Sequence, residues 1–338
     1  MKPPSASLPE AGPRQAAPVP LARWLSAGLL FGFGVFLALA LVGDLRQISG
    51  RMLAFQWRWY PLVLAFTLFN YTLRLVKFHF YLGQVGARSF PLRQSARLFV
   101  AGFPLAVTPG KVGEALKGVW IQRACGVPLA RGLAVVVAER ISDGLAVLAL
   151  STLGVVAYPR YWPAFASVLA LLLSIIVVSQ VRPLALALLE LGARLPLIRR
   201  LVPPLREFYE GSFALFRPRA TLFAVGLGTV SWLGEGVGFY LILLGLGIPA
   251  SWQALSLAVF ILAFSTIVGA VSTLPGGLGA AEASIAGMLI LLLGLSPDVA
   301  AAATLLIRFA TLWFGVCLGL LVWAFSPDLF KVVAPDES

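Results

Sequence analysis

The feature that most constrains the fold is a set of charged residues inside apolar sequence, within residues 103–145. A proline and a glycine interrupt a hydrophobic run there, and ionisable residues follow in two groups. The break is Pro109 and Gly110, the first group is Lys111, Glu114 and Lys117, and the second is Glu139, Arg140 and Asp143. Ionisable groups at membrane depth are costly unless they are paired or hydrated, and a broken helix is tolerated there only beside protein or a wet cavity. The stretch therefore predicts a polar site inside a membrane protein.

A related pattern recurs in residues 274–313. Its break contains Pro275, Gly276, Gly277 and Gly279, and Glu282 follows as the counterpart of Glu114, displaced by two residues. The distance from Gly126 to Arg140 is 14 residues (140 − 126), and the distance from Gly294 to Arg308 is the same (308 − 294). Matching Gly/Pro-interrupted segments in two halves of a chain indicate the binding site of a repeat-built transporter.

Composition agrees with a membrane protein. Hydrophobic residues make up 59% of the chain, charged residues 12%, and the mean hydropathy is +0.92, which indicates transmembrane helices rather than the alternating pattern of a β-barrel. The net charge of +12 is typical of cytoplasmic loops beside anionic headgroups, and no basic stripe with aromatics indicates nucleic-acid binding. One histidine (His79) and two cysteines (Cys125, Cys317) exclude a disulfide framework and a histidine-based metal site or catalytic triad. We expect no metal and no cofactor.

The hydrophobic runs predict an all-α integral membrane protein with about six transmembrane helices, two re-entrant hairpins and one domain over residues 23–326. The expected helices are residues 24–43, 61–82, 131–157, 163–181, 220–246 and 297–325, and the expected hairpins are 95–124 and 252–293. The repeat units are then 95–157 and 252–325. Tails are expected at 1–22 and 327–338, and the basic, proline-rich segment 182–219 predicts helices on the membrane surface. A signal peptide ending near Ala40 is the alternative for the first run.

The distribution of basic residues predicts the topology. If each hairpin enters and leaves on one side, both termini, the 83–97 and 124–130 loops and the 182–219 segment share that side, which holds most lysines and arginines. The positive-inside rule places that side in the cytoplasm. The first hairpin then enters from the cytoplasm and the second from outside, so the repeat is inverted, which places a substrate site between the hairpins.

Several residues are candidates for binding a lipid phosphate. Helix N-termini at the two breaks suit an anion, Arg140 and Arg308 suit bidentate phosphate recognition, and Glu114 and Glu282 suit neutralisation, a cationic group or a proton relay. Each has a structural alternative. Arg140 could pair with Asp143 one turn on, Glu139 could be a structural partner, and Lys111 and Lys117 could extend to the headgroups.

Two further groups of charged residues have more than one possible role. Glu235 is alone between glycines in its span and needs a partner, for which Arg140 and Arg308 are candidates. Arg74, Lys77 and His79 end the second span, where they could extend to the interface, or Arg74 could line the mouth of a cavity.

These motifs resemble the flippase-like family that is also named for the transmembrane region of lysylphosphatidylglycerol synthases, over about residues 24–325. The resemblance implies movement of an anionic, aminoacylated or polyprenyl-linked lipid between leaflets of the cytoplasmic membrane. The positions that match the family pattern are Pro109, Gly110, Gly113, Glu114, Arg140, Asp143, Pro275, Gly276, Gly277, Gly279, Glu282 and Arg308. The soluble aminoacyl-transferase domain of the full synthases is not found before Ser338, so we expect no synthesis of aminoacyl lipids.

Three functions remain open from the sequence. The first is a lipid flippase or scramblase, and the second is an accessory partner of a lipid-modifying synthase or glycosyltransferase. The third is a membrane enzyme that acts on lipid phosphates through Glu114, Glu282 and the arginines. The repeat favours transport, because alternating access uses two similar halves, and no nucleophile motif is visible for an enzyme.

Overall fold

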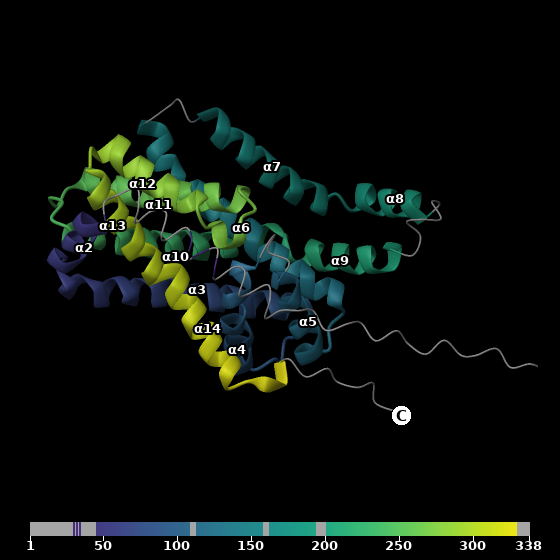
Figure 1. The fold of residues 1–338 in the computed structure, drawn as a ribbon. Helices are drawn as coiled ribbons and strands as arrows, with labels where there is room; N and C mark the ends of the chain where they lie inside the picture. The colour runs from purple at the N-terminus through teal and green to yellow at the C-terminus, as the bar shows by residue number, and fades with distance from the viewer. Residues whose placement is uncertain are drawn as a thin grey trace, which may run out of the picture.

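The computed structural model describes residues 45–108, 113–157, 162–193 and 201–329, together with Leu30, Gly32 and Gly34. The expected helix at 24–43, both expected tails and the turn at Pro109, Gly110 and Lys111 lie wholly or largely outside these residues. Within them the regular structure is entirely helical, which confirms the all-α class (Figure 1).

The helices follow the predicted runs closely. They are α2 (Leu45–Ala54), α3 (Tyr60–Gln84), α4 (Leu92–Ala101), α5 (Gly113–Cys125), α6 (Leu129–Ala157), α7 (Trp162–Gln180), α8 (Arg182–Ala193), α9 (Val202–Leu215), α10 (Pro218–Gly245), α11 (Trp252–Val271), α12 (Ala280–Leu293), α13 (Pro297–Arg308) and α14 (Phe314–Ala324). Local chemistry sets several ends. Ser251 Oγ accepts a hydrogen bond from the Ala254 amide at the start of α11, and Gly294 ends α12 in the left-handed conformation at φ 63°.

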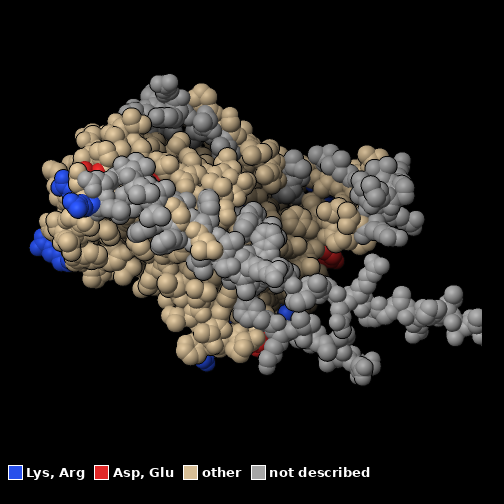
Figure 2. Space-filling view, in the orientation of Figure 1, with Lys and Arg blue, Asp and Glu red and all other residues tan. Residues whose placement is uncertain are grey.

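Four stretches are long and apolar enough to cross a bilayer: Pro218–Gly245, Trp252–Val271, Pro275–Leu293 and Pro297–Ala324. Large apolar side chains such as Leu222 and Leu291 point outward and are mostly exposed. The face in Figure 2 is mostly uncharged, and its lysines and arginines lie at the left end and the lower edge. These features define a multi-pass helical membrane protein.

Glycines allow the helices around α10 to approach closely. A Cβ at Gly236 would lie 2.8 Å from the Val259 side chain of α11, and one at Gly228 would lie 2.9 Å from Ala146 of α6. Small residues at helix crossings bring backbones together in membrane proteins. The glycines around Glu235 therefore place α10 in contact with α3, α6 and α11, and this contact brings the polar groups of these helices together.

The two expected hairpins differ in length. The first has arms of 10 and 13 residues, α4 and α5, with a 3₁₀ turn at Phe103–Val107, so each arm is about 15–20 Å long and shorter than a bilayer core. The second has the 20-residue α11 and the stretch Pro275–Leu293, and each of these is long enough for a full crossing. The arms of the second hairpin contain one charged residue, Glu282, which is why they form longer apolar helices.

The segment 182–219 forms helices interrupted by prolines, as predicted. α8 packs against α9, and these two helices lie with α7 on the side of the molecule that projects to the right in Figure 1. α9 also packs on α6, where Arg131 Nε lies 2.8 Å from Glu207 Oε2. Its position on a membrane surface stays a prediction.

Candidate functional site

A cavity of about 230 Å³ lies between the two broken segments. The first hairpin contributes Phe99, Gly102, Glu114 and Lys117 to its wall, and the second contributes Ser265, Thr266, Gly269, Gly276 and Gly277. Helices α3, α6 and α10 supply charged and aromatic groups, namely Tyr71, Arg74, Glu139, Arg140, Trp232 and Glu235, and Arg308 and Thr311 come from the C-terminal helices. The cavity therefore joins segments that are far apart in the sequence.

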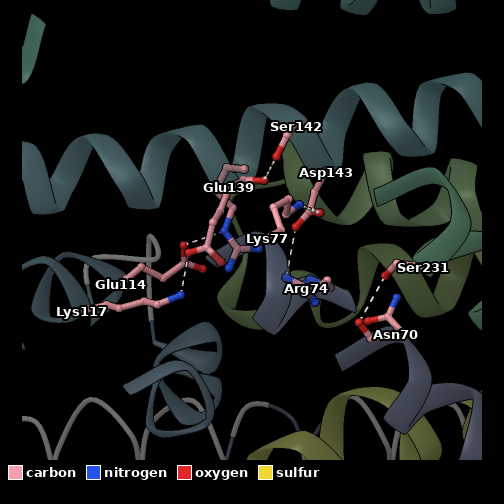
Figure 3. A network of polar contacts seen from close by, with 10 residues as sticks. Asn70, Arg74, Lys77, Glu114, Lys117, Glu139, Ser142, Asp143 and Ser231 are labelled. Atoms are coloured by element: carbon pink, nitrogen blue, oxygen red, sulfur yellow. Dashed lines mark hydrogen bonds and ion pairs between the residues drawn. The ribbon is translucent and has the colours of Figure 1, made fainter. Parts of the chain in front are cut away.

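Ion pairs join α5 to α6 on one side of the cavity (Figure 3). Arg140 Nε donates to Glu114 Oε2 at 2.8 Å, and Lys117 Nζ donates to Glu139 Oε2 at 2.6 Å. The Lys117 ammonium also lies 4.2 Å from the centre of the Phe78 ring, which suits a cation–π contact. The suggestion that Lys117 extends to the headgroups is therefore wrong, because Lys117 is buried and paired.

Asp143 has partners on a different helix from the one that the sequence suggested. It pairs with Arg74 at 3.1 Å and with Lys77, both on α3, and not with Arg140 (Figure 3). Residues three apart share a helix face, but Arg140 is held by Glu114 of α5 instead. The alternative that Arg140 is a structural partner of Asp143 is thus wrong.

The end of the second span is also buried. Lys77 is fully buried, Arg74 is largely buried against Asp143 with its guanidinium 5.6 Å from the centre of the Trp232 ring, and His79 Nδ1 lies 2.8 Å from Ser95 Oγ. The suggestion that Arg74 and Lys77 extend to the interface is therefore wrong. Arg74 lines the cavity, as the other interpretation of this residue required.

A second Glu–Arg pair lies on the other side of the cavity. Arg308 Nε lies 2.5 Å from Glu282 Oε1, and Arg308 Nη2 donates to the Gly276 carbonyl at 2.9 Å. A turn of π-helix, Phe309–Trp313, follows Arg308 directly, and such turns are frequent at functional sites. In both pairs the glutamate and the arginine are 26 residues apart in the sequence. The Glu–Arg spacing is therefore identical in the two segments, whereas the distance from the Pro-Gly break to the glutamate differs by two residues.

The two helix N-termini are less open than the sequence suggested. Glu282 Oε2 accepts from the Gly279 amide at 2.7 Å, so the start of α12 is capped by its own carboxylate. At the start of α5, the Gly113 amide donates to Thr108 Oγ1 at 3.0 Å. The expectation that these amides are open to an anion is wrong for Gly113 and Gly279, because side chains already occupy them. The arginines are then the main candidates for anion binding.

Glu235 is buried, with 5% of its surface exposed, and it lines the cavity. It forms no hydrogen bond or ion pair in the described part of the chain, where the two candidate partners, Arg140 and Arg308, pair with Glu114 and Glu282 instead. Arg74 and Arg308 nevertheless act on it through their charge. Glu235 is thus a buried carboxylate that faces a cavity without a direct partner.

The proposed site residues fall into three groups. Those on the cavity wall are Glu114, Lys117, Glu139, Arg140, Glu235, Gly276, Gly277 and Arg308; those behind it are Gly113, Asp143, Pro275, Gly279 and Glu282; and Pro109, Gly110 and Lys111 lie outside the described residues. Sequence reasoning missed Tyr71, Trp232, Ser265 and Thr266. For two of these residues the spacing offered a signal. Tyr71 precedes Arg74 by three residues and Trp232 precedes Glu235 by three, which places each pair on one helix face.

Metal binding has no visible basis in this site. Among residues 45–108, 113–157, 162–193 and 201–329, no three side chains of His, Cys, Asp or Glu are placed to hold an ion. The polar groups of the cavity are instead arginines, a lysine, carboxylates and hydroxyls. Such groups bind anions and exchange protons.

The fold and the cavity define a multi-pass helical membrane protein with a charged internal site. The chain matches the family described as the lysylphosphatidylglycerol synthase TM region over residues 25–319 and belongs to that family, as the sequence motifs suggested.

Two relatives are similar along different lengths. A UPF0104 membrane protein of Methanothermobacter thermautotrophicus is 27% identical over 314 residues, which cover 86% of this chain and 90% of the relative. A second UPF0104 membrane protein of the same archaeon is 32% identical over 125 residues, 36% of this chain and 35% of the relative.

Proposed function

We propose that the protein moves a lipid with a phosphate-containing headgroup between the leaflets of the cytoplasmic membrane. One observation carries this proposal: a cavity inside an apolar helical body is lined by Arg140 beside the first hairpin and by Arg308 beside the second. A charged headgroup needs such an internal polar site to cross a bilayer, because the hydrocarbon core strongly disfavours it. The acyl chains remain in the surrounding lipid.

The arginines have donors left for a phosphate. Arg140 uses Nε for Glu114, and 48% of its side chain is exposed where it lines the cavity. A guanidinium has five N–H donors and binds phosphate through two parallel hydrogen bonds. Glu114 orients Arg140 while its Nη groups remain available for the headgroup. Arg74, which shares Asp143 with Lys77, adds positive charge to the same wall.

The proposed transport uses the two halves alternately. In this scheme about six helices cross the membrane, the two broken hairpins form an inverted repeat, and both termini are cytoplasmic. The equal spacing of the two Glu–Arg pairs supports this arrangement. Inverted repeats permit alternating access, since each half can take the conformation of the other. A separate lipid-modifying enzyme would supply or receive the lipid.

Leaflet exchange in proteoliposomes tests the proposal. The assay compares phosphatidylglycerol, phosphatidylcholine and a polyprenyl phosphate, with Arg140→Ala and Arg308→Ala as test variants and the exposed Arg58→Ala as the matched control. We expect exchange of the phosphate-bearing anionic lipids by the native protein and the control, and no exchange by the test variants. Exchange at the rate of empty liposomes for all three lipids would contradict transport. Chemical conversion of the lipid would favour the enzyme instead.

A further inference from the structure

The positive and negative side chains around the cavity are equal in number. Five cations and five carboxylates form the cavity wall and its ion pairs in the described part of the chain: Arg74, Lys77, Lys117, Arg140 and Arg308 against Glu114, Glu139, Asp143, Glu235 and Glu282. The set is therefore neutral when every group is ionised.

Four of the carboxylates have direct partners, and the pairing is uneven. Glu114, Glu139 and Glu282 each neutralise one cation. Asp143 alone holds both Arg74 and Lys77. This group of three therefore carries one positive charge in excess, and Glu235, which has no direct partner among the described residues, balances it.

The surroundings of Glu235 leave it open to the cavity. On α3, Tyr71 and Arg74 face the same cavity; on α6 the charged groups are Glu139, Arg140 and Asp143; and at the end of α13 the cation is Arg308. α11 supplies only the hydroxyls of Ser265 and Thr266, because it contains no titratable residue. Among the described residues, Glu235 is thus the carboxylate of the wall that no hydrogen bond restrains.

Binding of an anionic headgroup would upset this balance. A phosphodiester adds one negative charge to a buried site, where uncompensated charge is costly. The headgroup also competes with Glu235 for the field of Arg74 and Arg308. We propose that Glu235 takes up one proton from water when an anionic headgroup enters the cavity, so that lipid and proton are bound together.

This inference rests on the proposed function and adds a source of energy to it. The proton binds to a carboxylate oxygen of Glu235, the phosphodiester remains an anion, and no covalent bond of the lipid changes. A neutral complex of lipid and proton then moves through the cycle, and the proton leaves with the headgroup on the other side. A pH gradient would therefore drive accumulation of the lipid in one leaflet.

Proton uptake on binding tests the inference in purified protein. The protein is held in weakly buffered detergent, a pH indicator reports protons, and tryptophan fluorescence reports binding of dioctanoyl phosphatidylglycerol. We expect uptake of about one proton per bound lipid and an affinity that falls by up to about tenfold per pH unit as the pH rises. Dioctanoyl phosphatidylcholine, whose headgroup is neutral overall, should cause no uptake.

Glu235→Gln distinguishes the assignment from its alternatives. This variant imitates the protonated carboxyl group, so we expect no proton uptake and a higher affinity for phosphatidylglycerol than the native protein has at alkaline pH. Glu190→Gln on the exposed side of α8 is the matched control and should behave like the native protein.

The possible results distinguish failure of this inference from failure of the proposed function. Binding of phosphatidylglycerol by the native protein without proton uptake would overturn the inference and leave transport intact. Uptake that persists in Glu235→Gln would also overturn it, because another group would then carry the proton. Absence of binding would overturn the proposed function for an anionic phospholipid and the inference with it. If Glu235→Gln fails to fold, the comparison of phosphatidylglycerol with phosphatidylcholine on the native protein still tests proton uptake.

Discussion

The two Glu–Arg pairs have the same spacing in the sequence and different surroundings in the structure. In the first pair, 48% of the Arg140 side chain is exposed to the cavity; in the second, 15% of Arg308 is exposed, and the Gly276 carbonyl accepts a further hydrogen bond from it. Glu282 also caps its own helix, because its Oε2 accepts a hydrogen bond from the Gly279 amide. The same Glu–Arg spacing thus leaves one arginine half exposed on one side of the cavity and holds the other largely enclosed on the opposite side, although both line the cavity.

Alanine at the two arginines should reveal this difference. Arg308→Ala and Arg140→Ala should each abolish lipid exchange, but Arg308→Ala should cost about 3 kcal/mol in stability, because it leaves Glu282 buried and unpaired. Arg140→Ala should cost clearly less, because Arg140 is half exposed. Thermal unfolding in detergent measures both. Equal destabilisation by the two variants would break the comparison.

Removal of the shared carboxylate on α6 should have a large effect on stability. Asp143→Asn leaves Arg74 and Lys77 without their partner in a buried site, so we expect a loss of about 3–5 kcal/mol, measured by unfolding in detergent. Lys77→Met in the same chain should recover part of that loss, since Lys77 is fully buried. A double variant no more stable than Asp143→Asn alone would contradict the pairing.

The turn of the second hairpin should tolerate less change than a helix position nearby. Gly277 has φ 66°, and a Cβ there would lie 2.8 Å from the Gly269 Cα, so Gly277→Ala should destabilise by about 1–3 kcal/mol. The control is Gly287→Ala in α12, where a Cβ would meet no atom within 4 Å, and it should be neutral or slightly stabilising. The same unfolding assay compares them. A neutral Gly277→Ala would show that the turn does not depend on close backbone contact.

Topology can be tested with little effect on stability. In a background without Cys125 and Cys317, a cysteine in place of Arg160 should react with an impermeant reagent from outside, and one in place of Arg199 only from the cytoplasm. Labelling of intact cells and of inverted vesicles measures this. The opposite pattern would contradict the cytoplasmic location of the termini, and labelling of both positions from the same side would contradict the inverted repeat.

Much of the fold could be predicted because local sequence controls it. Apolar runs form helices in a membrane, since every backbone group must find a hydrogen-bond partner within the segment. The Pro-Gly-Gly sequence after α11 interrupts the helix because Gly276, Gly277 and Gly279 take positive φ angles. The bounds expected for the second hairpin, 252–293, agree with α11 and α12, but the prediction of a re-entrant hairpin did not anticipate that each arm is long enough for a full crossing.

Many residues of the candidate site could also be predicted from the sequence. Ionisable residues inside apolar runs are rare, and they usually face the protein interior or a cavity. The helices, the breaks and the presence of buried charge follow from local sequence. Which charges meet depends on how the helices pack: Asp143 pairs with two cations from α3, and Glu235 has no direct partner in the part of the chain that the structure describes. The physical reason is that ion pairs form across helices that packing brings together, and spacing within one helix does not specify which helix will be its neighbour.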